Sequence, residues 1–108
     1  MSFANTPPPP YYAVIFTSQR TEKDSKGYKR TAELMVELAS KQTGFLGVES
    51  SRDHDGLGIT VSYWDSLESI KQWKEHMAHQ KAKEKGKKDW YSAYITRICK
   101  VDRDYHSI

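Results

Sequence analysis

The sequence predicts an α+β domain of the ferredoxin-like type, in which two helices cover one face of a four-stranded antiparallel sheet. Four segments are rich in β-branched and aromatic residues, and two segments have apolar residues at helical spacing. They follow one another in the order strand, helix, strand, strand, helix, strand. A chain of 108 residues suits one such domain with a buried core. We place the domain at residues 11–104, between an extended leader (1–10) and a C-terminal tail (105–108).

The first strand follows a proline-rich leader. Residues 7–10 are four prolines, which lack amide hydrogens and have fixed backbone angles, so an extended leader is expected. Residues 11–18 contain no strand breaker and should form a strand. Apolar side chains alternate onto both of its faces, whereas a sheet with one face in water would place polar residues on that face.

The first helix is expected over residues 28–42, where Ala32, Met35, Val36 and Ala39 form an apolar stripe. Gly44 should end it, because glycine tolerates the left-handed conformation that closes a last helical turn. A second strand then covers residues 45–51. Residues 52–56 contain Asp53, His54, Asp55 and Gly56 and are interpreted as a hairpin turn, not as a metal site, and the third strand follows at 58–64.

A second helix should begin at Asp65, which is followed three positions later by Glu68, a capping pattern. Its buried stripe would contain Ile70, Trp73 and Met77, and the helix should reach about residue 86. Residues 90–101 are then the last strand, which is also apolar on both faces. The sheet face without helices would be a large exposed apolar patch in a monomer, so we expect a two-fold homodimer in which two such sheets face each other.

Composition narrows the possible environments and partners. The formal charge is only +3, and no apolar run has the length of a membrane helix or a signal peptide, so neither a nucleic acid nor a membrane is an expected partner. One cysteine cannot form an internal disulfide, and a cytoplasmic protein is expected. The lysines of residues 81–88 are interpreted as a solvated helix end, with guidance of an anionic substrate as the alternative.

Four short segments carry a family resemblance. They are residues 44–50 (GFLGVES), 63–66 (YWDS), 73–79 (WKEHMAH) and 90–94 (WYSAY). In this order and spacing they resemble the antibiotic biosynthesis monooxygenase family of dimeric α+β barrels, which is related to haem-degrading monooxygenases. The resemblance covers residues 11–104. It implies a homodimer with a small-molecule cavity between the helices and sheet of each subunit, and for some members oxygenation of an aromatic substrate without a metal or flavin.

The resemblance also implies site residues. In the haem-degrading branch an Asn on the first strand works with a Trp and a His of the second helix. Trp73 matches that Trp, and His79 is the better match for the iron-ligating His, with His76 as the competing choice. The Asn has no counterpart, because the end of the first strand reads Thr17, Ser18, Gln19. Trp73 and His79 are therefore the candidate catalytic residues, His79 being a metal ligand only if haem is bound.

Helical geometry leaves the choice between the histidines open. At 100° per residue, His76 lies about 60° and His79 about 120° from Trp73, so His79 faces the cavity only if the helix bends. Trp73 itself can pack in the core with one edge and present the other to a ligand. The remaining candidate substrate-binding residues, chosen because aromatic planes suit flat ligands, are Tyr63, Trp64, His76, Trp90 and Tyr94.

Three functions remain compatible with these residues. The first is a monooxygenase acting on a small aromatic or polycyclic molecule without metal or flavin. The second is a haem-binding or haem-degrading protein. The third is a non-catalytic dimeric module that binds small molecules, which the missing Asn makes credible.

Overall fold

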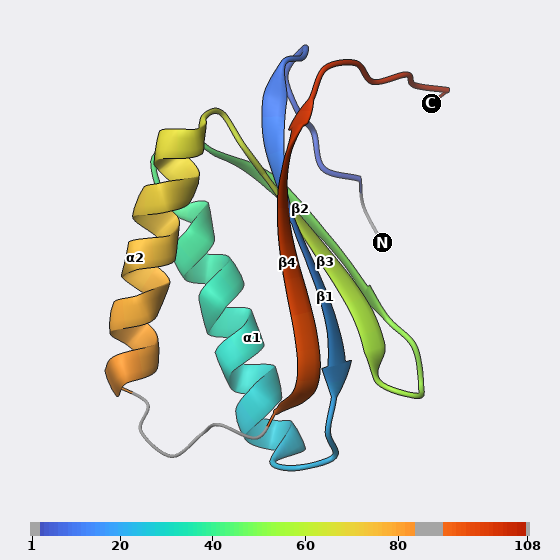
Figure 1. Ribbon diagram of the computed structural model, residues 1–108, viewed down its shortest axis with the longest axis vertical. Coiled ribbons are helices and arrows are strands. Elements are labelled where there is room, and N and C mark those ends of the chain that lie inside the picture. The colour runs from blue at the N-terminus through green and yellow to red at the C-terminus, as the bar shows by residue number, and fades with distance from the viewer. Residues whose placement is uncertain (1–2, 84–89, 108) are drawn as a thin grey trace.

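A computed structural model of the chain describes residues 3–83 and 90–107, without the side chains of residues 79–83 (Figure 1). The predicted order of strands and helices is confirmed. The elements are β1 (Tyr11–Arg20), α1 (Ser25–Ser40), β2 (Phe45–Arg52), β3 (Leu57–Trp64), α2 (Leu67–Lys83) and β4 (Tyr91–Val101). The expected end of the second helix near residue 86 lies outside the described residues.

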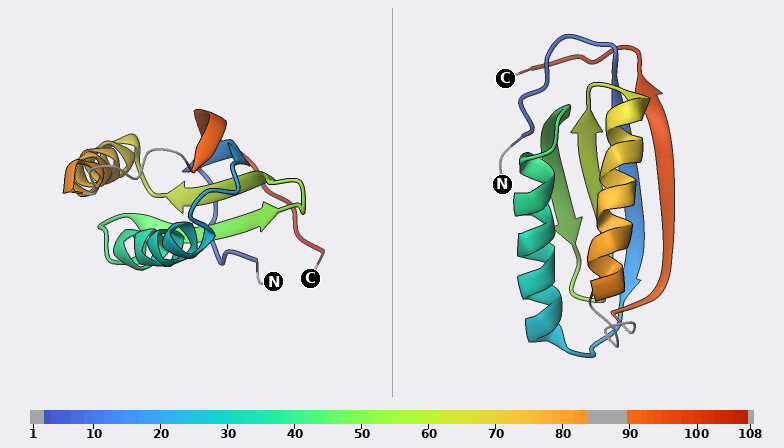
Figure 2. Two further views of the ribbon diagram at one scale, coloured as in Figure 1. Left: turned by 90° about the horizontal axis from the view of Figure 1, so that it is seen from below. Right: turned by 90° about the vertical axis from the view of Figure 1, so that its left-hand side faces the viewer.

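The four strands form one antiparallel sheet in the order β2-β3-β1-β4. This is the ferredoxin-like arrangement that the sequence predicts. Both helices lie on the same face of the sheet, whereas β4 runs along one edge and is not covered by either helix (Figure 2). Every described side chain of β4 between its two end residues is exposed. The edge strand is therefore accessible from both faces.

The core lies between the helices and the central strands. Its buried members are Trp64 of β3, Ala39 of α1, and Ile70 and Trp73 of α2. Tyr12 and Val14 of β1 pack against them, so alternate residues of β1 face the helices. The alternation of aromatic and β-branched residues along β1 and β3 thus fixes which side chains the helices cover.

Both helix starts differ from the sequence prediction. Helix α1 begins at Ser25, because the carboxylate of Asp24 accepts a hydrogen bond from the Gly27 amide at 3.2 Å. Helix α2 is capped by Ser66 instead of by an Asp65–Glu68 pair: its hydroxyl accepts from the Ser69 amide at 3.1 Å. Asp65 and Ser66 can both cap a helix, so the sequence admits two cap positions, and the structure adopts the later one.

The other face of the sheet is covered at one end only. The Tyr11 hydroxyl donates to Asp104 at 2.6 Å, and the Ala4 amide donates to Glu49 at 2.9 Å, so the leader and the C-terminal segment lie over this end. Farther along the same face, Ile59 and Ile95 are 47% and 52% exposed. They flank Thr17 on neighbouring strands and form the exposed centre of an apolar patch.

Candidate functional site

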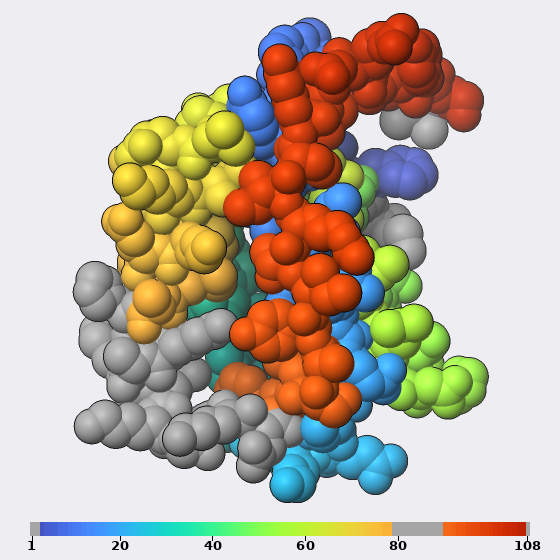
Figure 3. Space-filling model, in the orientation of Figure 1, coloured from blue at the N-terminus to red at the C-terminus, as the bar shows by residue number. Residues whose placement is uncertain are grey.

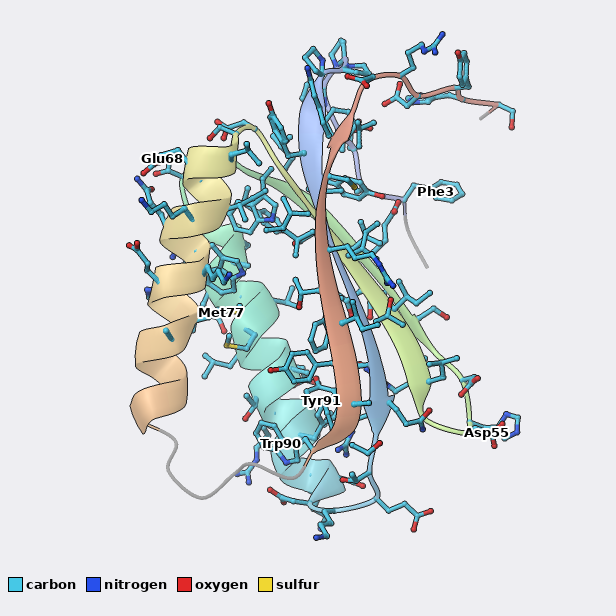
Figure 4. All side chains as sticks on the ribbon, viewed as in Figure 1. Phe3, Asp55, Glu68, Met77, Trp90 and Tyr91 are labelled. Atoms are coloured by element: carbon cyan, nitrogen blue, oxygen red, sulfur yellow. The ribbon has the colours of Figure 1, made fainter. Side chains whose placement is uncertain are left out.

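The surface is hollowed between α2 and β4, and atoms of α1 are visible at the bottom of this hollow (Figure 3). We refer to it as the α2–β4 hollow. Met77 of α2 and Tyr91 of β4 point into it from opposite sides (Figure 4). Tyr94 and Ile98, 59% and 46% exposed, lie on the helix-facing side of β4, opposite Ser18 and Val14 of β1. The hollow is therefore largely apolar and accessible, as a site for a small apolar molecule should be.

Three rings on the helix side form a continuous stack. The ring centroids of Trp64 and Trp73 are 6.0 Å apart with an interplanar angle of 27°, and those of Trp73 and His76 are 5.7 Å apart with an angle of 20°. Trp64 is fully buried and its indole N–H donates to Ser62 at 2.9 Å. Trp64 therefore supports Trp73 from the core and offers no surface to a ligand, unlike the substrate contact expected from sequence.

His76 is the histidine that the described geometry directs inward. Its Nε2 atom is buried, and no side chain or backbone group that the structure describes forms a hydrogen bond with it. A buried polar atom without a partner costs stability, and such atoms are rare in folded proteins. This cost points to a function for the imidazole.

The competing candidate, His79, belongs to α2, which runs uninterrupted from Leu67 to Lys83. His79 was expected to face the cavity only if the helix bends. No break interrupts the described helix at this point. The side chain of His79 itself lies outside the part of the chain that the structure describes.

A second aromatic group lies where β4 begins. Tyr91 contacts Phe16 of β1 and Tyr28 of α1, with ring centroids 5.3 and 5.8 Å apart. Trp90 also meets Tyr28, at 6.0 Å, and Tyr94 meets Phe16, at 5.5 Å. The predicted residues Trp90 and Tyr94 thus belong to one group, which is distinct from the Trp64–Trp73–His76 stack but lies on the same side of the sheet.

The hydroxyl of Tyr91 stays protonated well into the alkaline range. Burial raises the pKa of Tyr91 above its usual value, the interaction with the Tyr28 hydroxyl raises it further, and the positive charges of Arg52 and Arg20 lower it by less. At neutral pH this hydroxyl is therefore a hydrogen-bond donor as well as an acceptor.

Tyr63 is a correction to the predicted site. It precedes Trp64 on β3, and strand alternation sends its side chain to the opposite face of the sheet. There its ring meets Tyr11 at 5.8 Å, and its hydroxyl donates to Glu49 at 2.6 Å. Burial, and then the bond to Glu49, raise the pKa of the Tyr63 hydroxyl. Tyr63 lines no common cavity with Trp73.

Two arginines beside the second aromatic group were not anticipated from the sequence. The guanidinium carbon of Arg20 lies 3.8 Å from the Tyr28 ring centroid, and that of Arg52 lies 5.8 Å from the same centroid. Arg52 also donates to the hydroxyl of Ser18 at 2.7 Å. Ser18 is 2% exposed and stands near where the haem-degrading branch has its Asn. Arg52 was counted as part of a turn, and only the sheet register brings it to Ser18.

The charged turn after β2 is held by its own hydrogen bonds. Asp53 accepts hydrogen bonds from the amides of Asp55 and Leu57 at 2.9 and 3.0 Å, as a hairpin turn requires. Among the described residues, no group of three or more His, Cys, Asp or Glu side chains could hold a metal ion. A separate surface hollow on α1 shares no residue with the predicted site; it is lined by Lys26, Lys29, Arg30 and Glu33.

No helix in the described part of the chain combines the length and the apolar character needed to cross a membrane.

Comparison with known proteins agrees with this architecture. Residues 10–85 match the protein family described as antibiotic biosynthesis monooxygenase. The uncharacterized protein YqjZ of Bacillus subtilis (strain 168) is 60% identical over 100 residues, which cover 93% of this chain and 87% of that protein.

Solved structures resemble the fold at low sequence identity. PA3566 of Pseudomonas aeruginosa gives a TM-score of 0.66 at 13% identity, covering 90% of this chain and 97% of that one. A conserved protein of Methanosarcina mazei Go1 gives 0.64 at 11% identity, covering 88% and 94%.

Proposed function

Because the chain belongs to the antibiotic biosynthesis monooxygenase family, we propose that it oxygenates a small electron-rich aromatic molecule in the α2–β4 hollow, without a metal or flavin. The observation that carries this proposal is the buried, unpartnered Nε2 of His76, held in place by the Trp73 ring. An imidazole nitrogen that no described residue engages can accept a hydrogen bond from a substrate that reaches it.

We assign three roles to the residues of the hollow. His76 accepts the proton of a substrate hydroxyl. Trp73 orients the imidazole and presents an indole edge to the substrate. Tyr94 and Ile98 of β4 contact the flat face of the aromatic ring, which buries their exposed apolar surface.

For a hydroquinone substrate the reaction balances without a further reductant. Removal of a phenolic proton makes the ring electron-rich, and the ring then reacts with O₂. One ring C–H bond is replaced by a C–O bond, the two hydroxyls become carbonyls by loss of their hydrogens, and the second oxygen atom leaves as water. The substrate supplies all four electrons, so the products are a hydroxyquinone and water.

The experiment that tests this function is aerobic turnover of a panel of hydroquinones, followed by oxygen uptake and by the absorbance of the hydroxyquinone. His76→Ala should lower kcat by about 10²-fold or more, because a general base typically contributes that much. His54→Ala is the matched control, since its side chain is 91% exposed on the β2–β3 turn, and should retain full activity. Turnover equal to buffer for every substrate would favour a non-catalytic binding module instead.

The haem-binding alternative requires an imidazole nitrogen that faces a space wide enough for a porphyrin. Ser18, near the position of the missing Asn, already accepts a hydrogen bond from Arg52. The described residues therefore offer no free polar partner at the place where the haem-degrading branch has its Asn. Titration with haemin should therefore give no specific Soret shift; a shift that disappears in His76→Ala or His79→Ala would revive this alternative.

We further propose that the active form is a homodimer located in the cytoplasm. The support for the dimer is the apolar patch around Ile59 and Ile95 on the sheet face that no helix covers. Two such patches facing each other would remove this surface from water.

A further inference from the structure

Arg20 and Arg52 form a pair of cations on the helix-facing side of the sheet, at the end of the α2–β4 hollow where β4 begins. Both guanidinium carbons lie near the ring of Tyr28, 3.8 and 5.8 Å from its centroid. They are therefore within about 10 Å of each other. Both side chains are partly buried.

In the described part of the chain, the side chains of both arginines donate only to uncharged groups. Arg52 donates to the carbonyls of Ser18 and Gly56 and to the Ser18 hydroxyl, and Arg20 donates to the Trp90 carbonyl at 2.7 Å. All these acceptors are uncharged. No carboxylate among the residues that the structure describes forms an ion pair with either arginine. Two like charges brought together in a partly buried place favour the binding of an anion.

The chain also makes room for this pair. Gly58 lies between Ser18 and Arg52 in the sheet register. A Cβ atom at Gly58 would lie 2.5 Å from the guanidinium carbon of Arg52, so a larger residue at this position would displace the guanidinium from its present place. The Arg52 guanidinium is then fixed by Ser18, and one that is fixed before binding loses less entropy when it binds a ligand.

The aromatic neighbours identify the rest of the ligand. Arg52 lies 5.9 Å from the Tyr91 ring centroid, and Tyr91 points into the α2–β4 hollow (Figure 4). An anionic group bound by the arginines would therefore lie beside a molecule that contacts Tyr91 and Tyr94. The anionic group and the aromatic ring can then belong to one ligand. The planar guanidinium fork matches the two oxygens of a carboxylate.

We propose that Arg20 and Arg52 bind the carboxylate of an aromatic acid whose ring occupies the α2–β4 hollow. The proposal rests on the proposed function for the place of the ring, and it adds the substrate class: an aromatic molecule that carries a carboxylate.

Equilibrium binding of two probes of the same shape tests this assignment. 2-Naphthoate carries the carboxylate, and 2-naphthamide is its uncharged counterpart; binding is followed by calorimetry on the full chain. The naphthoate should bind at least tenfold more tightly, and its affinity should fall as ionic strength rises. Equal affinity for the two probes would overturn the proposal.

Substitution of the arginines shows whether they cause the preference for naphthoate over naphthamide. Arg20→Gln and Arg52→Gln should each weaken naphthoate binding at least tenfold and change naphthamide binding less than twofold. Arg103→Gln is the control, because this exposed arginine follows β4 at the opposite end of the sheet, and should change neither. If Arg52→Gln fails to fold, as judged by thermal unfolding, Arg20→Gln decides, since the Arg20 guanidinium donates to the backbone carbonyl of Trp90 and not to another side chain of the described residues. A loss of affinity that is equal for both probes would contradict the assignment.

Competition by phosphate tests whether the site selects aromatic carboxylates, and a comparison of binding with activity separates this proposal from the proposed reaction. Inorganic phosphate added as a competitor should displace naphthoate only at a far higher concentration; displacement at equal concentration would mean that the arginines bind any anion. Naphthoate is not a hydroquinone, so its binding does not depend on turnover. Loss of activity in His76→Ala with intact naphthoate selectivity, or the reverse, therefore distinguishes failure of this site from failure of the proposed reaction.

Discussion

At the scale of single residues, the local sequence says little about which polar groups meet. Ser18, Gly58 and Arg52 come from three strands, and only the register brings them side by side. The buried stripe of Ile70, Trp73 and Met77 could be inferred from helical spacing, but the stacking of Trp64, Trp73 and His76 depends on how β3 and α2 pack. The arginine pair could not be inferred, because its members are 32 positions apart and neither belongs to a recognisable motif.

Gly58 offers a direct test of this packing. Gly58→Ala should displace the Arg52 guanidinium and leave the buried Ser18 hydroxyl without a partner, a loss of about 1–3 kcal/mol in the free energy of unfolding. Urea denaturation measures it. In an Arg52→Ala background the same glycine substitution should cost much less, because no side chain then crosses the strand. Equal costs in the two backgrounds would show that Arg52 is not what excludes a Cβ atom at this position.

At the scale of elements, hydrophobic periodicity predicted every strand and helix, but the helix starts were displaced. The alternation of aromatic and β-branched residues is a strong signal because a whole face of each strand must be buried. The residue at which a helix begins depends instead on a few hydrogen bonds of its capping residue, which leave a weaker signal in the sequence. At the start of α2 the Ser66 hydroxyl accepts from the Ser69 amide and donates to the Ser69 hydroxyl, which in turn donates to Asp65 at 2.7 Å.

The cap register has a measurable consequence. Ser66→Ala should lower the free energy of unfolding by about 1 kcal/mol, as loss of a serine cap usually does. Glu68→Ala should cost less than about 0.5 kcal/mol, since its exposed side chain makes no contact with the cap. Thermal unfolding of the two variants in parallel compares them. A larger effect at Glu68 would support the earlier register that sequence alone suggested.

At the scale of the whole molecule, the fold was predictable and the site only in part. The order of the predicted elements indicated a four-stranded sheet with two helices. The apolar residues on both faces of the strands indicated that neither face of the sheet is simply exposed to water. Tyr63 was misplaced because neighbouring aromatic residues on a strand cannot line the same cavity. Trp64 lies on the helix side of the sheet and is buried too deeply to touch a ligand.

Assembly is the prediction that belongs to this scale. Size-exclusion chromatography with light scattering should give the mass of a dimer at micromolar concentration. Ile59→Asp should shift the protein to a monomer, because a charge would be placed at the centre of the apolar patch. Leu67→Asp is the matched control: Leu67 is also exposed, at 56%, but it lies at the start of α2, away from that face. A monomeric wild-type chain would contradict the proposed assembly.

The strand order also sets the sequence of events during synthesis. β1 is made first, yet it lies between β3 and β4, and Tyr11 pairs with Val101. Until the ribosome has released β4, one side of β1 has unpaired amide and carbonyl groups and an apolar surface. Pairing over such long sequence separations is slow, and exposed strand edges are prone to aggregation during this delay. The yield of folded protein should therefore depend on how quickly β4 emerges and reaches β1.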